Sequence, residues 1–374
     1  MTLSSPDPQP GGSFGYSVAS RGAVATVGAP NETANGVSGA GRAYVSYTNS
    51  GTLISSLESP NPQVNGHFGW AVAFGSSVAA GGKIAIVAAP FESAGGRSGA
   101  GTVYIFNATT GALRTTLASP NPVSGGEFGY SVALRGGNVF VGAPFEFVNG
   151  HAASGRVYVF SVVDGHLSRT FVSPNAQVGG EFGRSVAVRG DVCIVGAPNE
   201  TSGMGRAYVF SASTGALTST LTSPDPQVNG HFGWAVAAAL KIVLVGAPGE
   251  SSGGQRAAGN AYVFNAITGA IISTLTSPDP QSSGGFGYAV TLRDQTPVVG
   301  APFESAGGQA SAGHAYVLDA TTGALVSTLT SPIPQTDGCF GSSVAARNKI
   351  AVVGAPGETA NGQSGAGHAY IFGI

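Results

Sequence analysis

The chain has 374 residues, of which 42% are hydrophobic and only 9% are charged, and its net charge is −2. This apolar content allows a large buried core and excludes a disordered chain, although glycine and proline are abundant. The Lys and Arg residues are scattered singly along the sequence, so neither a nucleic-acid-binding surface nor a polybasic membrane patch is expected.

A Phe-Gly pair recurs along the whole chain and marks seven repeats. Consecutive pairs are 54, 60, 54, 50, 54 and 54 residues apart, and their phenylalanines are Phe14, Phe68, Phe128, Phe182, Phe232, Phe286 and Phe340. A fixed period of this size is typical of propellers and other repeat architectures. The second repeat carries the one sizeable insertion, around residues 74–82, and that segment holds no titratable side chain.

Each repeat predicts four short strands in a constant order. In the third repeat the first strand follows Phe-Gly (residues 130–134), and the second leads into Gly-Ala-Pro (residues 139–142). The fourth strand is a segment such as residues 216–221, and Ser-Pro-Asp/Asn-Pro-Gln follows it. Alternating apolar residues, β-branched residues and glycine-bounded turns favour strands. The third strand carries a recurrent tyrosine, at Tyr44, Tyr104, Tyr158, Tyr208, Tyr262, Tyr316 and Tyr370.

Seven such units predict an all-β, seven-bladed β-propeller with four antiparallel strands in each blade. We expect residues 1–374 to form one propeller domain. The last repeat ends after its third strand, at residues 369–372, whereas residues 2–9 match the end of a fourth strand with its following loop. The N-terminal strand is therefore expected to complete the last blade and close the ring, which leaves no open end.

The Phe-Gly pair, followed about 14 residues later by Gly-Ala-Pro, resembles the FG-GAP repeat of integrin α-subunit propellers and their bacterial relatives. The resemblance extends over the whole chain. It implies a binding or cell-adhesion role outside the cell. It also implies that partners meet one face of the disc, formed by the loops between strands two and three and by those leading into the next blade. We call this face the loop face.

Several blades of that family carry an Asp-x-Asp-x-Asp-Gly calcium loop between strands one and two. The corresponding segments here are tight turns such as residues 135–138, and no two of the eight aspartates are closer than 15 residues in sequence. Calcium binding needs six to eight clustered oxygen atoms. Calcium sites of the family type are therefore not expected, and the sequence predicts no other metal or cofactor.

A glutamate lies two residues after every Ala-Pro pair, so that seven glutamates should form a ring on the loop face. In the structural interpretation, which we favour, each carboxylate caps backbone N–H groups of its own loop. In the functional interpretation, a wide acidic ring attracts a cation or a basic partner. Seven close like charges would raise some pKa values, so wide spacing or individual pairing is expected. The residues are Glu32, Glu92, Glu146, Glu200, Glu250, Glu304 and Glu358.

His67 and Trp70 flank one Phe-Gly pair, and His231 and Trp234 flank another. An exposed Trp beside a polar group suits stacking on a sugar ring, so these four residues are the candidate ligand-binding residues. Packing between blades explains the same series equally well. At the Trp position the other repeats carry Tyr16, Tyr130, Arg184, Tyr288 and Ser342.

Catalytic signatures are missing from the sequence. It contains no nucleophile elbow, phosphate loop or Cys/His metal pattern, and its distinctive residues repeat blade by blade. His314 and His368 share one position in adjacent repeats, where strand spacing keeps them roughly 10 Å or more apart, too far to share a zinc ion. We therefore predict a non-catalytic module that binds a protein or glycan partner. A structural or self-assembling surface protein and an enzyme stay open as alternatives.

The sequence says little about the compartment. No apolar stretch approaches the roughly 18 residues of a membrane-spanning segment, so membrane insertion is not expected. Residues 1–6 have neither the basic end nor the apolar stretch of a signal peptide. Cys193 and Cys339 fall at different positions of different repeats, and we interpret both as free, small apolar residues.

Overall fold

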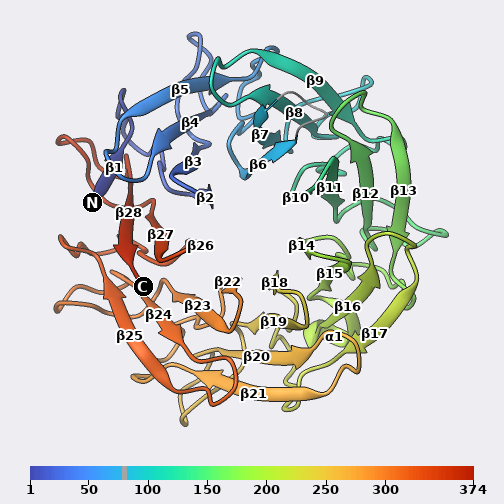
Figure 1. Ribbon diagram of the computed structural model, residues 1–374, viewed down its shortest axis with the longest axis vertical. Helices are drawn as coiled ribbons and strands as arrows, with labels where there is room; N and C mark the ends of the chain where they lie inside the picture. Colours follow the sequence, from blue (N-terminus) through green and yellow to red (C-terminus); the bar gives the residue numbers. More distant parts are fainter. Residues whose placement is uncertain (78–81) are drawn as a thin grey trace.

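The computed structural model describes residues 1–77 and 82–374, and its strands form a ring of blades around one axis (Figure 1). The described residues form seven sheets of four antiparallel strands, which confirms the predicted seven-bladed β-propeller. The one helix among them is a four-residue turn, α1 (Glu200–Gly203). No helix in this part of the chain is long and apolar enough to cross a membrane.

The first four blades follow one another along the chain. Blade 1 contains β2 (Ser17–Arg21), β3 (Val24–Ala29), β4 (Arg42–Tyr47) and β5 (Leu53–Glu58). Blade 2 contains β6 (Ala71–Ser77), β7 (Gly82–Ala89), β8 (Thr102–Asn107) and β9 (Leu113–Ala118). Blade 3 contains β10 (Ser131–Arg135), β11 (Asn138–Ala143), β12 (Arg156–Ser161) and β13 (Leu167–Val172). Blade 4 contains β14 (Ser185–Arg189), β15 (Val192–Ala197), β16 (Arg206–Ser211) and β17 (Leu217–Leu221).

The remaining three blades complete the ring. Blade 5 contains β18 (Ala235–Ala238), β19 (Ile242–Ala247), β20 (Asn260–Asn265) and β21 (Ile271–Thr276). Blade 6 contains β22 (Ala289–Arg293), β23 (Thr296–Ala301), β24 (His314–Leu318) and β25 (Leu325–Thr330). Blade 7 contains β26 (Ser343–Arg347), β27 (Ile350–Ala355), β28 (His368–Gly373) and β1 (Thr2–Ser4). The predicted strand boundaries agree with these to about one residue. The predicted insertion lies partly outside the described residues, which omit 78–81.

The N-terminal strand closes the ring, as predicted. Strand β1 pairs antiparallel with β28, with Leu3 opposite Ala369, and so supplies the outer strand of blade 7. The two termini consequently lie beside each other in the ring (Figure 1). Leu3 is 4% exposed and belongs to the apolar cluster between blades 7 and 1.

The hydrophobic core lies between adjacent blades. Each apolar cluster combines the second and third strands of one blade with the Phe of the next Phe-Gly pair and that blade's strands. Between blades 2 and 3, for example, Ile86 and Ile105 pack with Phe128 and Val141. All seven Phe-Gly phenylalanines are at most 2% exposed. The repeated Phe is therefore the side chain that joins consecutive blades.

The two glycines of the FG-GAP motif also meet across this boundary. A Cβ atom on Gly28, in the Gly-Ala-Pro of blade 1, would overlap the carbonyl oxygen of Gly69, in the Phe-Gly of blade 2. Gly69 has φ +97°, a conformation that side chains other than hydrogen disfavour. The hydroxyl of Ser17 donates to the same Gly69 carbonyl at 2.7 Å. Close backbone contact between blades thus explains why both motif positions carry glycine.

Candidate functional site

The seven glutamates that follow Ala-Pro are buried, each at most 1% exposed. Each accepts a hydrogen bond from the recurrent tyrosine of its own blade at 2.5 or 2.6 Å. The donors are thus side-chain hydroxyl groups, whereas the sequence led us to expect backbone N–H groups. The carboxylates lie beneath the loop face and are not displayed on it.

A serine from the preceding blade donates to several of these carboxylates. Ser59, in the linker after blade 1, donates to Glu92 of blade 2 at 2.5 Å, and Ser173 donates to Glu200 at the same distance. Ser119 donates to Glu146 in the same way. This serine begins the Ser-Pro linker that follows the fourth strand of each repeat, so the carboxylate joins neighbouring blades.

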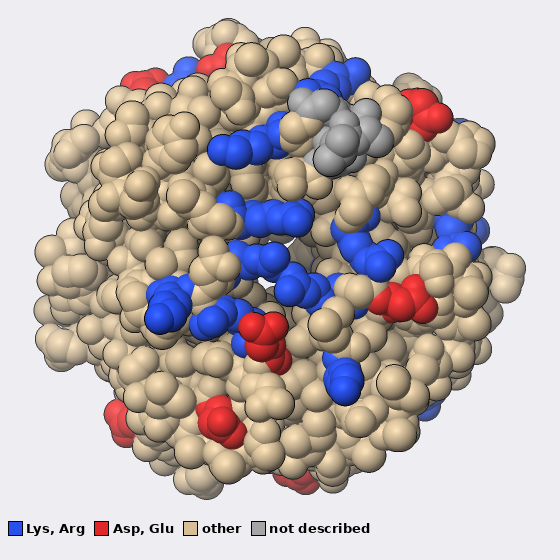
Figure 2. All heavy atoms as spheres, viewed as in Figure 1, with Lys and Arg blue, Asp and Glu red and all other residues tan. Residues whose placement is uncertain are grey.

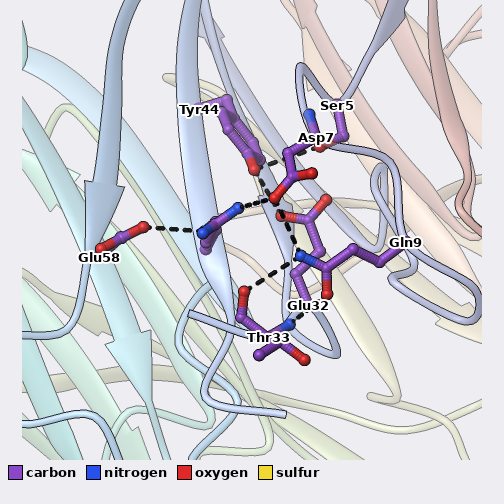
Figure 3. A network of polar contacts seen from close by, with 8 residues as sticks. Ser5, Asp7, Gln9, Glu32, Thr33, Tyr44 and Glu58 are labelled. Atoms are coloured by element: carbon purple, nitrogen blue, oxygen red, sulfur yellow. Dashed lines mark hydrogen bonds and ion pairs between the residues drawn. The ribbon is translucent and has the colours of Figure 1, made fainter. Parts of the chain in front are cut away.

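Figure 3 shows this junction where blade 7 meets blade 1. Tyr44 donates to Glu32 at 2.5 Å, and Ser5 donates to the Tyr44 hydroxyl at 3.2 Å. The side chain of Gln9 accepts from the backbone N–H of Thr33 at 2.7 Å and donates to its carbonyl at 3.2 Å. The linker glutamine therefore fixes the backbone beside the buried glutamate.

Burial raises the pKa of five of these glutamates, while the Ser and Tyr hydrogen bonds act in the opposite direction. The five are Glu32, Glu92, Glu146, Glu200 and Glu250. The predicted His314 and His368 lie beside the other two carboxylates, with Nδ1 atoms 3.2 Å from Glu304 and 3.1 Å from Glu358. The described residues contain no group of three or more His, Cys, Asp or Glu side chains arranged to hold a metal.

The candidate Trp residues line a pocket of about 260 Å³ on the axis, at the loop-face ends of the innermost strands. One residue from each blade, directly before its first strand, forms this rim. We call the rim the aromatic mouth, and it consists of Tyr16, Trp70, Tyr130, Arg184, Trp234, Tyr288 and Ser342. The predicted series at the Trp position thus converges on one pocket.

Trp70 lies at the centre of an aromatic cluster. Its ring centroid is 4.7 Å from that of Tyr16, 5.6 Å from that of Tyr130 and 5.0 Å from that of Phe91. His67 packs behind it, with centroids 6.1 Å apart, and its Nδ1 atom lies 3.1 Å from the carbonyl oxygen of Pro30. His67 therefore supports the Trp70 ring and does not itself line the pocket. Burial lowers its pKa.

Trp234 carries a cation on its face. The Arg184 guanidinium carbon lies 3.8 Å from the Trp234 ring centroid and 5.2 Å from that of Tyr130, within the range of cation–π attraction. Glu181 holds this guanidinium at 2.7 Å, and His231 packs against Trp234 with centroids 5.7 Å apart. This role of Arg184 was not predicted from the sequence, although Arg184 occupies the position that carries Trp in two other repeats.

Glu127, the residue before another Phe-Gly pair, lies close to the charges of the aromatic mouth. Its side chain is half-buried. Burial raises its pKa to about 7, while Arg184 lowers it and Glu181 raises it further. The folded protein therefore binds this proton more tightly than the unfolded chain. The associated stabilisation is complete below the ordinary carboxyl pKa and is lost as the pH rises through about 7.

Replacing Glu127 with Gln should therefore stabilise the protein at pH 8. Because the side chain is partly solvated, we expect an increase of only about 1 kcal/mol in the free energy of unfolding. The increase should shrink toward zero at pH 5, where the native carboxyl already carries its proton. Urea denaturation at the two pH values measures this difference. An equal effect at both would contradict the raised pKa.

Seven four-stranded blades around an axial pocket define a β-propeller. The Phe-Gly and Gly-Ala-Pro glycines meet at every boundary except that between blades 2 and 3, where Ala88 replaces the glycine. Matches to the FG-GAP repeat cover residues 1–46, 114–160, 169–210, 216–264, 272–318 and 326–372. These stretches make up more than half of the chain, so the protein belongs to the FG-GAP repeat family. A comparison with curated proteins finds no match. Residues 47–113, outside the matches, include the repeat in which Ala88 replaces the motif glycine.

Proposed function

We propose that this protein is a non-catalytic binding module that takes a sugar ring of a glycan, or a side chain of a protein partner, into the aromatic mouth. The observation that carries the proposal is the pocket of about 260 Å³ whose rim holds five aromatic side chains and one arginine. Binding pockets commonly combine apolar walls with a few polar groups. The FG-GAP repeat supports an adhesion-type role outside the cell.

The two halves of the mouth offer different surfaces to a ligand. Trp70 stands between Tyr16 and Tyr130, and aromatic faces of this kind stack on the apolar face of a sugar. On the other side Arg184 covers Trp234 and supplies hydrogen-bond donors. In this proposal His67 and His231 orient the two indole rings. No calcium is required.

Binding of the labelled chain to a broad glycan array, with and without calcium, tests the proposal. We expect selective binding that calcium does not change. Trp70→Ala and Trp234→Ala should weaken it roughly tenfold or more, as truncation of a buried aromatic anchor does. Tyr47→Ala, which removes an exposed aromatic ring from the end of β4, is the matched control and should bind normally.

Glycan binding that survives both Trp substitutions would exclude the aromatic mouth as the site. A blank array would instead assign the mouth to a protein partner. A pull-down with the native chain, and with the two Trp variants beside the Tyr47→Ala control, would then identify that partner. A partner captured equally by all the variants would contradict the proposal.

The alternative, a self-assembling surface protein, has one observation in its favour. The outer strands of adjacent blades 5 and 6 expose apolar side chains, with Ile271 46%, Ile272 38%, Leu325 46% and Val326 64% exposed. Exposed apolar patches often mark contact surfaces. Light scattering over a range of concentrations decides this point, because a strictly monomeric protein would exclude self-assembly through this rim.

A further inference from the structure

Five of the seven innermost strands end in an arginine. Each occupies the final antiparallel pair of its hairpin, such as Arg21 opposite Val24 and Arg347 opposite Ile350. Because the first strand of every blade lies nearest the axis (Figure 1), its last residue faces the central opening at the end opposite the loop face. We call this group the arginine mouth, and it consists of Arg21, Arg135, Arg189, Arg293 and Arg347.

Figure 2 shows basic side chains gathered around the opening in the middle of this face. Two hollows of about 150 and 240 Å³ lie there, and Arg189 and Arg347 line both of them. Arg293 lines the first, and Arg21 and Arg135 line the second. Single arginines scattered along the sequence therefore form one positive cluster in space, which the sequence analysis did not foresee.

Little negative charge offsets these guanidinium groups. Among the described residues, no carboxylate lies within 4.0 Å of any of the five, whereas Arg42, Arg156 and Arg184 each have such a partner. In the part of the chain that the structure describes, Asp294 is the one carboxylate residue that lines either hollow. Asp191, in the same hairpin turn as Arg189, accepts hydrogen bonds from Ser211 and Ser213, which lower its pKa, and Arg135 lowers it further.

The guanidinium groups also repel one another. Burial lowers the pKa of Arg347, and the nearby Arg189 and Arg21 lower it further, against the opposite effect of Asp294. Repulsion between like charges destabilises the folded protein, and a bound anion would relieve it.

The fold does not need arginine at this position. Blade 2 carries Gly75 there and blade 5 carries Ala239, yet both blades form the same four strands. A Cβ atom on Gly75 would lie 2.5 Å from Cδ2 of Leu134 and 3.3 Å from Nη1 of Arg21, so the glycine leaves room for both of these side chains. The hairpin therefore forms without arginine at this position, and its geometry alone does not explain why five blades place an arginine at the opening.

We propose that the arginine mouth binds a multivalent tetrahedral oxyanion, a phosphate or sulfate group. Guanidinium groups match such groups with paired, charge-assisted hydrogen bonds. The arginines surround a small opening and do not form an extended stripe, so the site fits one anionic group better than a nucleic-acid backbone. This site lies at the other end of the channel from the aromatic mouth and does not depend on its function.

Calorimetric titration of the full chain with inorganic phosphate, inorganic sulfate and pyrophosphate, at constant ionic strength in chloride, tests the proposal. We expect saturable binding of at least one of them, weakened about tenfold or more in the Arg189→Ala/Arg347→Ala double variant. Arg97→Ala, which removes an exposed arginine from the loop between β7 and β8, is the matched control and should bind normally. Titration with glucose 6-phosphate distinguishes a phosphate group carried by a larger ligand from a free ion. Tighter binding than inorganic phosphate indicates a group on a larger ligand, and weaker binding indicates a free ion.

A thermal melt in chloride separates binding from folding. Since the double variant relieves repulsion, its melting temperature should not fall below that of the native chain. If the double Ala variant does not fold, the Arg189→Lys/Arg347→Lys variant replaces it. This variant keeps both positive charges but loses the paired N–H donors, so we expect its affinity for the anion to be several-fold lower than that of the native chain. Binding unchanged in these variants would overturn the proposal. So would binding of heparin without binding of any of the small anions.

Discussion

Removing residues 1–6 should lower the free energy of unfolding by about 3 kcal/mol or more, because blade 7 then lacks its outer strand. The deletion exposes the backbone edge of β28, to which β1 is paired. It also removes Leu3, whose burial at 4% exposure contributes about 2 kcal/mol. Ser5, which hydrogen-bonds to Tyr44 of blade 1, is lost as well. Urea denaturation of the native and truncated chains measures the change.

Point substitutions divide this effect into its parts. Leu3→Ala should cost about 2 kcal/mol through lost apolar contact alone. Ser4→Ala changes an exposed side chain of the same strand and should be close to neutral. A truncated chain as stable as the native one would mean that β1 contributes nothing to ring closure.

The sequence was sufficient to predict the fold because the same pattern of strands, turns and motif glycines occurs seven times along the chain. Gly28 and Gly69 show the physical reason, since two backbones meet where no Cβ atom fits. The second repeat departs from this rule. There Ala88 replaces the motif glycine, and a Cβ atom on the facing Gly129 would lie 3.0 Å from the Cβ atom of Ala88. Residues 68–113 of that repeat, which include Ala88, also lie outside the stretches matched by the FG-GAP family.

The charged sites were harder to predict, because they form only when blades come together. Arg189 is one residue of a tight turn in the sequence, and its neighbours in the arginine mouth are at least 54 residues away along the chain. Similarly, Ser59 and Glu92 belong to different repeats. The arginine mouth could have been predicted from the position of these residues within the repeat. An arginine at the end of the first strand in five repeats lies at the same end of the propeller axis in all five blades.

Replacing Glu92 with Ala should destabilise the protein by about 3 kcal/mol. The substitution leaves the hydroxyl groups of Ser59 and Tyr104 without the acceptor that they contact at 2.5 and 2.6 Å, inside a buried junction between two blades. Each unsatisfied buried donor lowers the free energy of unfolding by about 1–3 kcal/mol, and rearrangement of neighbouring side chains reduces this loss. Glu58→Ala, which breaks a surface pair with Arg42 at 2.9 Å, is the control and should cost less than about 1 kcal/mol.

Glu92→Gln separates the charge of this junction from its shape. The amide keeps one acceptor oxygen and nearly the same volume, so we expect a loss smaller than that of the Ala variant. Burial raises the pKa of Glu92, against the opposite effects of Ser59, Tyr104 and Thr102. The native protein is therefore stabilised at low pH, and this contribution is lost as the pH rises through the raised pKa. The difference between native protein and Gln variant should narrow with rising pH.

A double-mutant cycle with Tyr104→Phe shows whether carboxylate and hydroxyl act as one unit. Once Glu92 is Ala, the Tyr104 hydroxyl has lost its short hydrogen bond, and removing it should cost little or even stabilise the protein. The combined loss should therefore be clearly smaller than the sum of the two single losses. Additive losses would mean that the buried carboxylate joins the blades by some contact other than this hydrogen bond. Because the same Glu–Tyr pair occurs in all seven blades, one cycle tests the junction that recurs around the ring.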